Sequence, residues 1–316
     1  MGTKGKYHIR NWSQYNKSLI QRGSITVWFS EDTVEKWLAP GEKGKRGRPK
    51  VYSDDAILTA LIIRSVFHLP LRALEGFLRS LILLMGLGLR VPSYTQICRR
   101  AKYLKAGINR YSNNQVKDLV IDSTGLKVYG EGEWKVRQHG HSKRRIWRKL
   151  HLAVCPDSNE VIFEILTENS KSDCEVYPEL LKAIPKTTER TYGDGAYDTK
   201  KCYQASDQHG LQLITPPQKN AVYRKNAPSY LKSRNDAILE ILGLGGDGEA
   251  RKLWKKLKGY HLRSLSETAM FRFKALFGSH LKARGIQAQK AEVRAKCEAL
   301  NIITGLGMPE SEWIAA

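Results

Sequence analysis

The chain has 316 residues, with 53 Lys or Arg against 31 Asp or Glu, which gives a formal net charge of +22 at pH 7. This length exceeds that of a small disulfide-stapled module, and a hydrophobic content of 41% argues against intrinsic disorder. Because the positive charge is spread along the chain, we expect a folded, basic surface that attracts polyanions, nucleic acid above all. A basic protein that merely stays soluble is the alternative.

The five cysteines are scattered and form no CxxC pair, which excludes a zinc-finger spacing and is typical of a reducing compartment. The N-terminal residues lack the apolar core of a signal peptide. The longest apolar stretches, 56–63 and 81–89, are shorter than the roughly 20 residues that span a bilayer. We therefore expect a soluble cytoplasmic protein that has no membrane partner.

Helical patterns dominate the first third of the chain. Residues 1–39 are predicted to form a helical segment, with amphipathic helices over 11–22 and 31–38. Residues 53–110 are predicted to form a second helical region, with helices over 54–67, 71–84 and 94–105. Three short helices with tight joints fit a helix-turn-helix-like DNA-binding unit and a plain helical bundle equally well.

A basic linker rich in Gly and Pro, residues 40–52, joins the two helical parts. It contains Arg-Gly-Arg-Pro, the core of the minor-groove-binding element called the AT-hook. In such an element the side chains of Arg46 and Arg48 would lie along a narrow A·T groove. A linker without that function explains the same four residues as well.

From residue 111 the pattern changes to that of an α/β domain. Strands are expected over 118–122, 148–154, 161–166, 190–192 and 211–215, with helices over 174–184 and 199–209 and from Tyr260 onward. This order is that of a ribonuclease-H-like domain, with a mixed five-stranded sheet and flanking helices. We expect it to span 111–308, with an insertion at about 217–259, before a C-terminal tail at 309–316. Such an order alone does not establish a function.

Two carboxylates stand where predicted strands end. Asp122 follows Leu-Val-Ile, and Asp194 lies between two glycines after Thr-Tyr. Hard carboxylate oxygens at such positions are the ligands that Mg²⁺ prefers, and a pair of ions could activate a hydroxyl nucleophile and stabilise the leaving oxygen. Taken singly, each residue could equally cap a strand end or accept a hydrogen bond in a turn.

A third carboxylate belongs to a polar stripe in the last helical pattern. At about 100° per residue, Tyr260, Arg263, Glu267 and Lys274 fall within roughly 60° of one helix face. The stripe would place one metal-binding carboxylate among cations that hold DNA phosphates. A solvated face with Arg–Glu pairs at i, i+4 is the alternative.

These residues form three motifs that follow one another along the chain. They are Asp122-Ser123-Thr124-Gly125-Leu126-Lys127, Tyr192-Gly193-Asp194-Gly195-Ala196-Tyr197-Asp198, and the spaced set Tyr260, Arg263, Glu267 and Lys274. In them the chain resembles bacterial insertion-sequence transposases of the DDE type. Residues 12–16, 19–23 and 131–135 and the basic linker resemble the insertion-sequence-five branch of that family. The similarity runs from about residue 10 to about residue 308.

The resemblance implies that Asp122, Asp194 and Glu267 are catalytic and bind two Mg²⁺ ions per active site, for which Mn²⁺ can substitute. It implies that water cleaves the DNA at the inverted-repeat ends of a mobile element and that the freed 3′-hydroxyl attacks target DNA. It also implies a homodimer on paired ends, in the cytoplasm of a bacterium and associated with its nucleoid. The terminal DNA would be held by Tyr260, Arg263 and Lys274.

A basic block without acidic residues runs from Trp134 to His151. Its arginines fit contact with the DNA backbone, and Trp134 is the candidate that stabilises a flipped base beside the cut. The arginines expected to contact DNA are Arg137, Arg144, Arg145 and Arg148. His139, His141 and His151 lack a convincing zinc spacing and are interpreted as polar surface or DNA-contact residues. A solvated basic hairpin would show the same pattern.

Two other functions remain open at this point. One is a ribonuclease-H-like DNA nuclease or resolvase that cuts without strand transfer. The other is a non-catalytic DNA-binding regulator that uses residues 1–105 and the basic patches.

Overall fold

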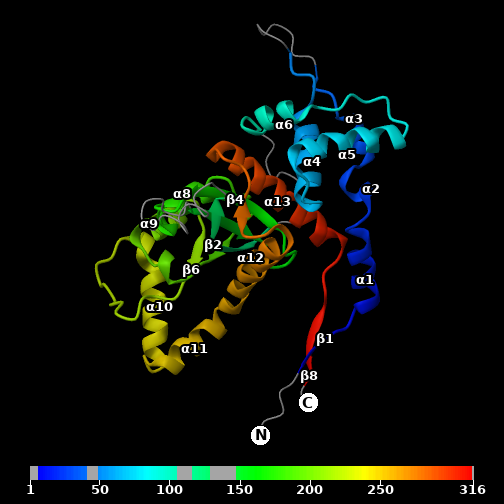
Figure 1. Ribbon diagram of the computed structural model, residues 1–316. Coiled ribbons are helices and arrows are strands. Elements are labelled where there is room, and N and C mark those ends of the chain that lie inside the picture. Colours follow the sequence, from blue (N-terminus) through cyan, green and yellow to red (C-terminus); the bar gives the residue numbers. More distant parts are fainter. Residues whose placement is uncertain (1–5, 41–48, 105–115, 129–146, 315–316) are drawn as a thin grey trace, which may run out of the picture. The chain divides into compact units, whose positions relative to one another are not determined.

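The computed structural model describes residues 6–40, 49–104, 116–128 and 147–314. In it the chain separates into two compact units (Figure 1). The first unit combines residues 1–107 with residues 295–316, and the second comprises residues 108–294. The domain boundaries expected from the sequence stay predictions.

The first unit consists mainly of short helices. They are α1 (Trp12–Gln21), α2 (Ile25–Trp28), α3 (Glu31–Glu35), α4 (Asp54–Val66), α5 (Leu71–Leu84) and α6 (Tyr94–Ala101). Serines cap three of the starts, since Ser30 accepts a hydrogen bond from the amide of Thr33, Ser53 accepts one from the amide of Ala56, and Ser93 forms a capping box with Gln96. Residues 56–63 of α4 are buried throughout, which makes this helix the centre of the unit's core.

The two ends of the described chain pair with each other in the first unit. Strand β1 (Lys6–Ile9) and strand β8 (Ser311–Ile314) are antiparallel, with His8 opposite Glu312. Residues 311–314, expected within a C-terminal tail, thus form a strand. The part of α13 (Ile286–Leu306) that follows residue 294 also belongs to this unit.

The second unit is built on a mixed sheet with the strand order β4-β3-β2-β5-β6. Its strands are β2 (Asp118–Val128), β3 (Trp147–Val154), β4 (Val161–Glu168), β5 (Arg190–Tyr192), β6 (Gln212–Ile214) and β7 (His280–Leu281). β2, β3 and β4 pair in antiparallel fashion, whereas β5 runs parallel to β2 and β6 parallel to β5. This is the expected ribonuclease-H-like α/β fold, except that β7 adds a sixth strand beside β2. Two residues are too few to show a period-two pattern in the sequence.

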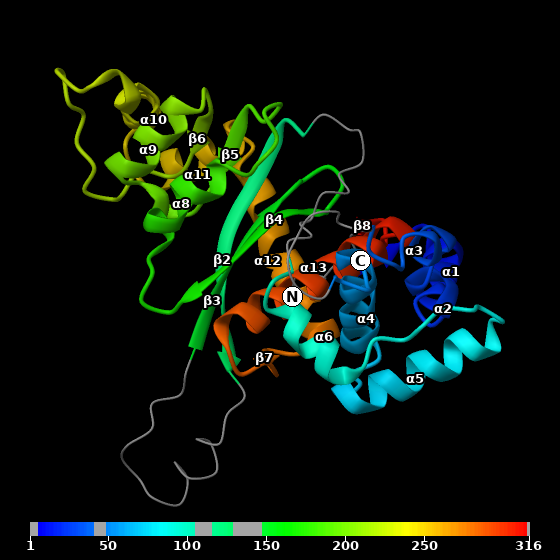
Figure 2. The ribbon, with the colours of Figure 1, turned by 90° about the horizontal axis from the view of Figure 1, so that it is seen from above.

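Helices cover both faces of this sheet (Figure 2). They are α8 (Asp173–Leu181), α9 (Lys200–Gln208), α10 (Lys232–Gly243), α11 (Gly248–Leu257) and α12 (Ser264–Phe277), with the 3₁₀ turns η1 (Gly195–Tyr197), η2 (Ser229–Leu231) and η3 (Tyr260–Arg263). Leu119 and Ile121 of β2 pack in the core with α8 and α9, whereas Val120 packs in the core with α10 and α11. Because side chains alternate along a strand, Asp122 lies on the face of Val120.

Within the described ranges, no single helix is long and apolar enough to cross a membrane. Helices α4 and α5 meet that criterion only when they are taken together, and the chain bends by 110° between them.

Candidate active site

The register of two parallel strands brings Asp122 and Asp194 to the same edge of the sheet, where β5 ends. The prediction that the first strand also ends there is wrong, because β2 continues through Asp122, which is paired with Leu152, to Val128. Val120 of β2 is paired with Tyr192 of β5, and each aspartate lies two residues beyond its paired residue. Neighbouring strands are about 4.8 Å apart, so residues at matching positions on them are close neighbours. The two motifs therefore meet at this edge, although 71 residues of sequence lie between them.

The loop that carries Asp194 is held tightly. The carboxylate Oδ1 of Asp194 accepts a hydrogen bond of 2.9 Å from the amide of Ala196 and so caps η1. The Thr215 hydroxyl at the end of β6 donates to the Asp194 carbonyl oxygen at 2.6 Å. A Cβ on Gly193 would lie 2.6 Å from Cδ2 of Tyr197, so only glycine fits before Asp194.

Asp122 is largely buried, with 15% of its side chain exposed. Its Oδ1 accepts a hydrogen bond of 2.7 Å from the amide of Ser123, and Ser266 of α12 donates to Oδ2 at 3.4 Å. Burial raises the pKa of Asp122 above its ordinary value, and the nearby Asp194 carboxylate raises it further. The hydrogen bond from the Ser123 amide and the positive charge of Arg263 lower this pKa, but they do not outweigh burial.

Arg263 links Asp122 to Glu267. Its Nη1 donates to Oε1 of Glu267 at 2.7 Å, and its Nη2 lies 3.3 Å from Oδ2 of Asp122. The third donor, Nε, is buried and has no hydrogen-bond partner in the part of the chain that the structure describes. Glu267 itself is 59% exposed, so its carboxylate is held at the surface by Arg263.

Tyr260 is the first residue of η3, three residues before Arg263. Burial raises the pKa of the Tyr260 hydroxyl to about 12. The charges of Asp194, Asp122 and Glu267 also raise this pKa, whereas the charge of Arg263 lowers it. Its ring packs against the core that contains Val120, and Nζ of Lys255 lies 5.4 Å from the ring centre. Of the last motif, Arg263 is thus the residue that contacts an aspartate directly.

The prediction of one continuous helix from Tyr260 is wrong. Gly259 adopts a φ of 65°, residues 260–263 form η3, and α12 begins only at Ser264. Tyr260 and Arg263 therefore lie before the α-helix, although the Arg263–Glu267 pair at i, i+4 is present. Lys274 lies on α12 seven residues beyond Glu267, on the same side and about 10 Å further along the axis.

Six of the predicted DNA-contact residues lie outside the described residues: Arg46, Arg48, Trp134, Arg137, Arg144 and Arg145. Arg148 is described, and it faces protein partners. Its Nε donates to Oε1 of Gln289 at 2.9 Å, and its Nη1 lies 3.7 Å from Glu168. Its contact with DNA stays a prediction.

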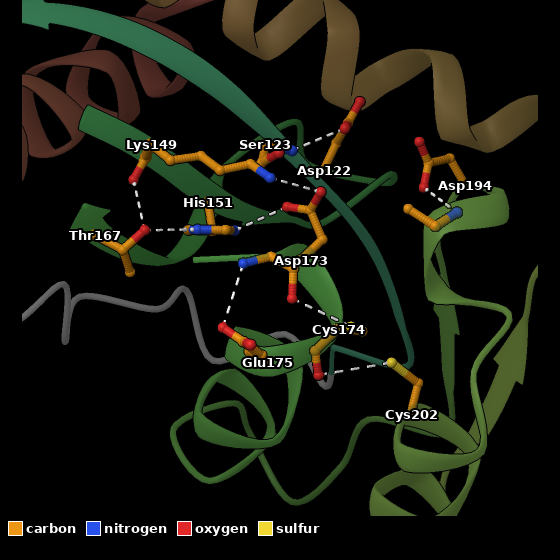
Figure 3. Close-up of polar contacts among 12 residues, drawn as sticks. Asp122, Ser123, Lys149, His151, Thr167, Asp173, Cys174, Glu175, Asp194 and Cys202 are labelled. Carbon is orange, nitrogen blue, oxygen red and sulfur yellow. Dashed lines mark hydrogen bonds and ion pairs between the residues drawn. The ribbon is translucent and has the colours of Figure 1, made fainter. Parts of the chain in front are cut away.

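The interpretation of His151 as a surface or DNA-contact residue is wrong. Its side chain is 1% exposed and faces Asp173 and Thr167 beneath the sheet (Figure 3). An alternating strand pattern such as residues 148–154 leaves open which face is buried, which is why the sequence did not reveal this. Ser266 and Asp173 also escaped the sequence analysis, because each meets partners far away in the chain.

Asp198, the second aspartate of the motif that contains Asp194, has a structural role. Its buried carboxylate accepts hydrogen bonds from Nε of Arg234 at 2.8 Å, the Gln218 amide at 2.8 Å and the Tyr203 hydroxyl at 3.1 Å. It therefore ties the loop after Asp194 to α9 and α10.

The donor set fits a hard divalent cation, because Asp122 and Asp194 offer carboxylate oxygens at one edge. In the described residues, no group of three or more His, Cys, Asp or Glu is placed to hold a metal ion. The third predicted ligand, Glu267, has its carboxylate paired with Arg263.

The sheet order defines a ribonuclease-H-like domain, which carries two aspartates at the edge where β5 ends. Two family models, both described as a transposase DDE domain, match residues 20–131 and 116–302. The chain belongs to this family of DDE transposases. The family implies that a divalent metal ion is required.

A protein of Aquifex aeolicus (strain VF5), described as uncharacterized, is 35% identical over 136 residues. This match covers 38% of the present chain and 39% of that protein. The chain thus spans about two fifths of the curated relative that it matches.

Three solved structures are similar at low levels. A piggyBac transposase synaptic complex with hairpin DNA has a TM-score of 0.40 at 10% identity, with 95% of this chain and 77% of that chain covered. The Drosophila P element transposase strand transfer complex has a TM-score of 0.27 at 11% identity, covering 87% and 85%. The Mos1 mariner paired end complex with Mn has a TM-score of 0.23 at 13% identity, covering 79% and 85%. Because these scores are low, the family assignment rests on the sequence matches.

Proposed function

We propose that the protein is a DNA transposase whose catalytic residues are Asp122, Asp194 and Glu267. The observation that carries this proposal is the meeting of Asp122 and Asp194 at one sheet edge, with Glu267 joined to Asp122 through Arg263. The substrate is the DNA at the inverted-repeat ends of a mobile element of the insertion-sequence-five type.

The reaction proceeds in two displacements at phosphorus. Water attacks the phosphodiester at the element's end and releases a 3′-hydroxyl. That hydroxyl then attacks a phosphodiester of target DNA and forms the new 3′–O–P bond while the target's own 3′-oxygen leaves. Two Mg²⁺ ions, or Mn²⁺ in their place, would lower the pKa of the attacking group and stabilise the charge on the leaving oxygen. Asp122 and Asp194 would hold them.

Arg263 has two functions in the proposed mechanism: it pairs with the carboxylates in the free protein, and it would bind a DNA phosphate. In the protein alone its guanidinium satisfies Glu267 and Asp122, so neither carboxylate is left uncompensated. A DNA phosphate would compete for that guanidinium, whose Nε has no hydrogen-bond partner among the described residues. Binding of DNA would thereby free Glu267 to turn toward the cations. Tyr260 and Lys274 would hold the terminal strand beside it.

Nucleic acid as the partner is supported by charge. With a net charge of +22, the protein attracts DNA strongly, and the affinity should fall steeply as salt rises because binding releases condensed counterions. A homodimer that holds two ends together, in the bacterial cytoplasm and at the nucleoid, is part of the same proposal.

The decisive experiment is a cleavage and strand-transfer assay. The substrates are duplexes that carry the inverted repeats bordering the coding frame, together with a supercoiled target plasmid and Mg²⁺. Asp122→Asn, Asp194→Asn and Glu267→Gln should each lower cleavage by more than about 100-fold, because loss of groups that merely orient metal ligands already costs 10–100-fold. Asp207→Asn on the exposed side of α9 is the matched control and should cleave normally.

Each outcome distinguishes among the candidate functions. Plasmid joined to pre-cut ends supports a transposase. Cleavage without any joined product would instead identify a nuclease or resolvase. If DNA is bound but not cut under any metal condition, the protein is a DNA-binding regulator and the proposal fails.

A further inference from the structure

The segment between β6 and α10, residues 217–228 and here called the Tyr223 loop, extends away from the sheet (Figure 1). It begins beside the segment that carries Asp194. The Thr215 hydroxyl donates to the Asp194 carbonyl oxygen at 2.6 Å, and the Gln218 amide donates to Oδ2 of Asp198 at 2.8 Å. The start of the loop is therefore fixed to residues 194–198.

Side chains of α10 and α11 hold the backbone of the Tyr223 loop. The guanidinium of Arg251 donates to the carbonyl oxygens of Pro217 at 2.7 Å and of Gln218 at 3.1 Å. The Asn235 side chain accepts a hydrogen bond from the Arg224 amide at 3.3 Å and donates to the Arg224 carbonyl oxygen at 2.8 Å. The backbone is thus held at the start of the loop and again at Arg224. A loop ordered in this way loses less conformational entropy when it binds a ligand.

The middle of the Tyr223 loop exposes two apolar side chains. Val222 is 71% exposed, and Tyr223 is 41% exposed. A tyrosine ring is flat and has few rotatable bonds, so a partner can cover it at little cost in side-chain entropy. Because Tyr223 directly precedes Arg224, whose backbone is held, its ring is presented from a fixed point of the loop.

The Tyr223 loop is also strongly basic. The sequence has no Asp or Glu between residues 208 and 235. Lys219, Arg224 and Lys225 are exposed, and among the residues that the structure describes none of these three cations has a salt bridge to a carboxylate. They favour a polyanion as the partner, and they disfavour a second copy of the same loop, because two such loops would repel each other.

Cations beside an exposed aromatic ring are the combination with which proteins bind single-stranded nucleic acid. The cations contact phosphates, while a base stacks on the ring. Inside a duplex both faces of a base are covered by its neighbours, so an unpaired base is the one that can stack on a protein ring. The loop therefore fits unpaired nucleotides better than a continuous duplex.

We propose that the Tyr223 loop binds unpaired nucleotides at a DNA end, with a base stacked on Tyr223 and phosphates held by Lys219, Arg224 and Lys225. This inference rests on the proposed function, in which DNA is the partner. Because the loop is anchored to residues 194–198, the nucleotides that it binds would belong to the same DNA end as the phosphodiester at the candidate active site.

The test measures the affinity of the full-length protein for fluorescein-labelled DNA in EDTA, where no cleavage takes place. The two probes are a blunt duplex and the same duplex with a short single-stranded extension. Tyr223→Ala should weaken binding of the extended probe by at least about 5-fold, the lower limit for the loss of one stacked base, and leave the blunt probe unaffected. Tyr223→Phe keeps the ring and should bind as the unsubstituted protein does. Leu239→Ala, which truncates a side chain of α10 that is 47% exposed, is the matched control.

The salt dependence of binding tests the cations. Arg224→Gln and Lys225→Gln should each lower the slope of log affinity against log salt concentration by about 0.7 for the extended probe, the value for one phosphate of a single strand. Lys252→Gln removes an exposed cation of α11 that is paired with Glu249, and it should leave the slope unchanged.

The outcomes separate this inference from the proposed function. If the unsubstituted protein binds neither probe, the proposed function fails, and the inference fails with it. If it binds DNA but Tyr223→Ala loses affinity for neither probe, or for both equally, the inference alone is overturned. A loss in Tyr223→Phe as large as that in Tyr223→Ala would also overturn it, because the ring would then not be the binding group. Thermal unfolding of each variant checks that the fold is retained.

Discussion

Nη2 of Arg263 lies 3.3 Å from Oδ2 of Asp122, although 141 residues separate the two in the chain. The same guanidinium donates to Glu267 at 2.7 Å. An arginine thus occupies the position between two carboxylates that would face a divalent metal. The first prediction follows from this contact.

Replacing Arg263 by Gln should strengthen Mn²⁺ binding to the DNA-free protein several-fold and weaken DNA binding. Two carboxylates would lose the cation that compensates them, so a metal ion would meet a more negative site. The measurement is a Mn²⁺ titration of both proteins without DNA, followed by DNA binding at several salt concentrations. Lys252→Gln, which removes an exposed cation paired with Glu249, serves as the control and should leave Mn²⁺ affinity unchanged. Weaker Mn²⁺ binding in Arg263→Gln would show that Arg263 does not compete with the metal ion for the two carboxylates.

Asp122→Asn should stabilise the metal-free protein at neutral pH. The pKa of Asp122 is raised in the folded state, chiefly by burial, so the folded state binds the proton more tightly than the unfolded state. The native aspartate therefore costs stability as the pH rises through that raised pKa. Below its ordinary pKa of 3.8 the aspartate is protonated in both states, and this cost is absent.

Urea unfolding in EDTA at pH 7 and near pH 4 measures this difference. The advantage of Asp122→Asn should be present at pH 7 and should shrink toward pH 4. With saturating Mn²⁺ the order should reverse at pH 7, because binding to the folded state stabilises only the protein that has the ligand. If the stability of Asp122→Asn relative to the unsubstituted protein increased as the pH fell, the pKa shift of Asp122 would have the opposite sign.

Asp198→Ala should lower the free energy of unfolding of the second unit by about 3–5 kcal/mol. The substitution removes the acceptor for Arg234, Gln218 and Tyr203 and leaves the arginine without its buried partner. Glu249→Ala offers the contrast, since the Lys252–Glu249 pair is exposed and contributes about 0–1 kcal/mol. Differential scanning calorimetry distinguishes the two variants. Equal, small effects would mean that Asp198 does not hold this loop.

Gly193→Ala should destabilise the loop that carries Asp194 and reduce Mn²⁺ affinity. The new Cβ would lie 2.6 Å and 2.9 Å from Cδ2 and Cγ of the buried Tyr197 ring, which cannot move freely. Overpacking of this kind costs about 1–3 kcal/mol. Gly195→Ala is the comparison for stability, because its nearest contact would be 4.0 Å from the carbonyl oxygen of Pro216. Urea unfolding of both variants measures whether only Gly193→Ala lowers the free energy of unfolding.

The local pattern of the sequence identified the strands and the position of Asp194 just beyond β5, but it ended the first strand at Asp122, whereas β2 continues to Val128. A run such as Leu119-Val120-Ile121 is buried on both faces, and such runs are recognisable without a structure. The hairpin of β3 and β4 was equally clear from its alternation and its turn residues. The start of α12 was not, because η3 continues the same spacing with a tighter turn.

Only the tertiary structure decided which face of the sheet each polar residue occupies and which partner it meets. His151 belongs to an alternating strand, and its burial follows from the packing of α8 over that face. The contacts Arg263–Asp122 and Lys149–Asp173 join segments far apart in the chain, and they depend on strand order and register. The sequence by itself predicted which groups would carry the chemistry, since motifs and periodicity are local properties. Their convergence was decided by the fold, since it is a property of the whole sheet.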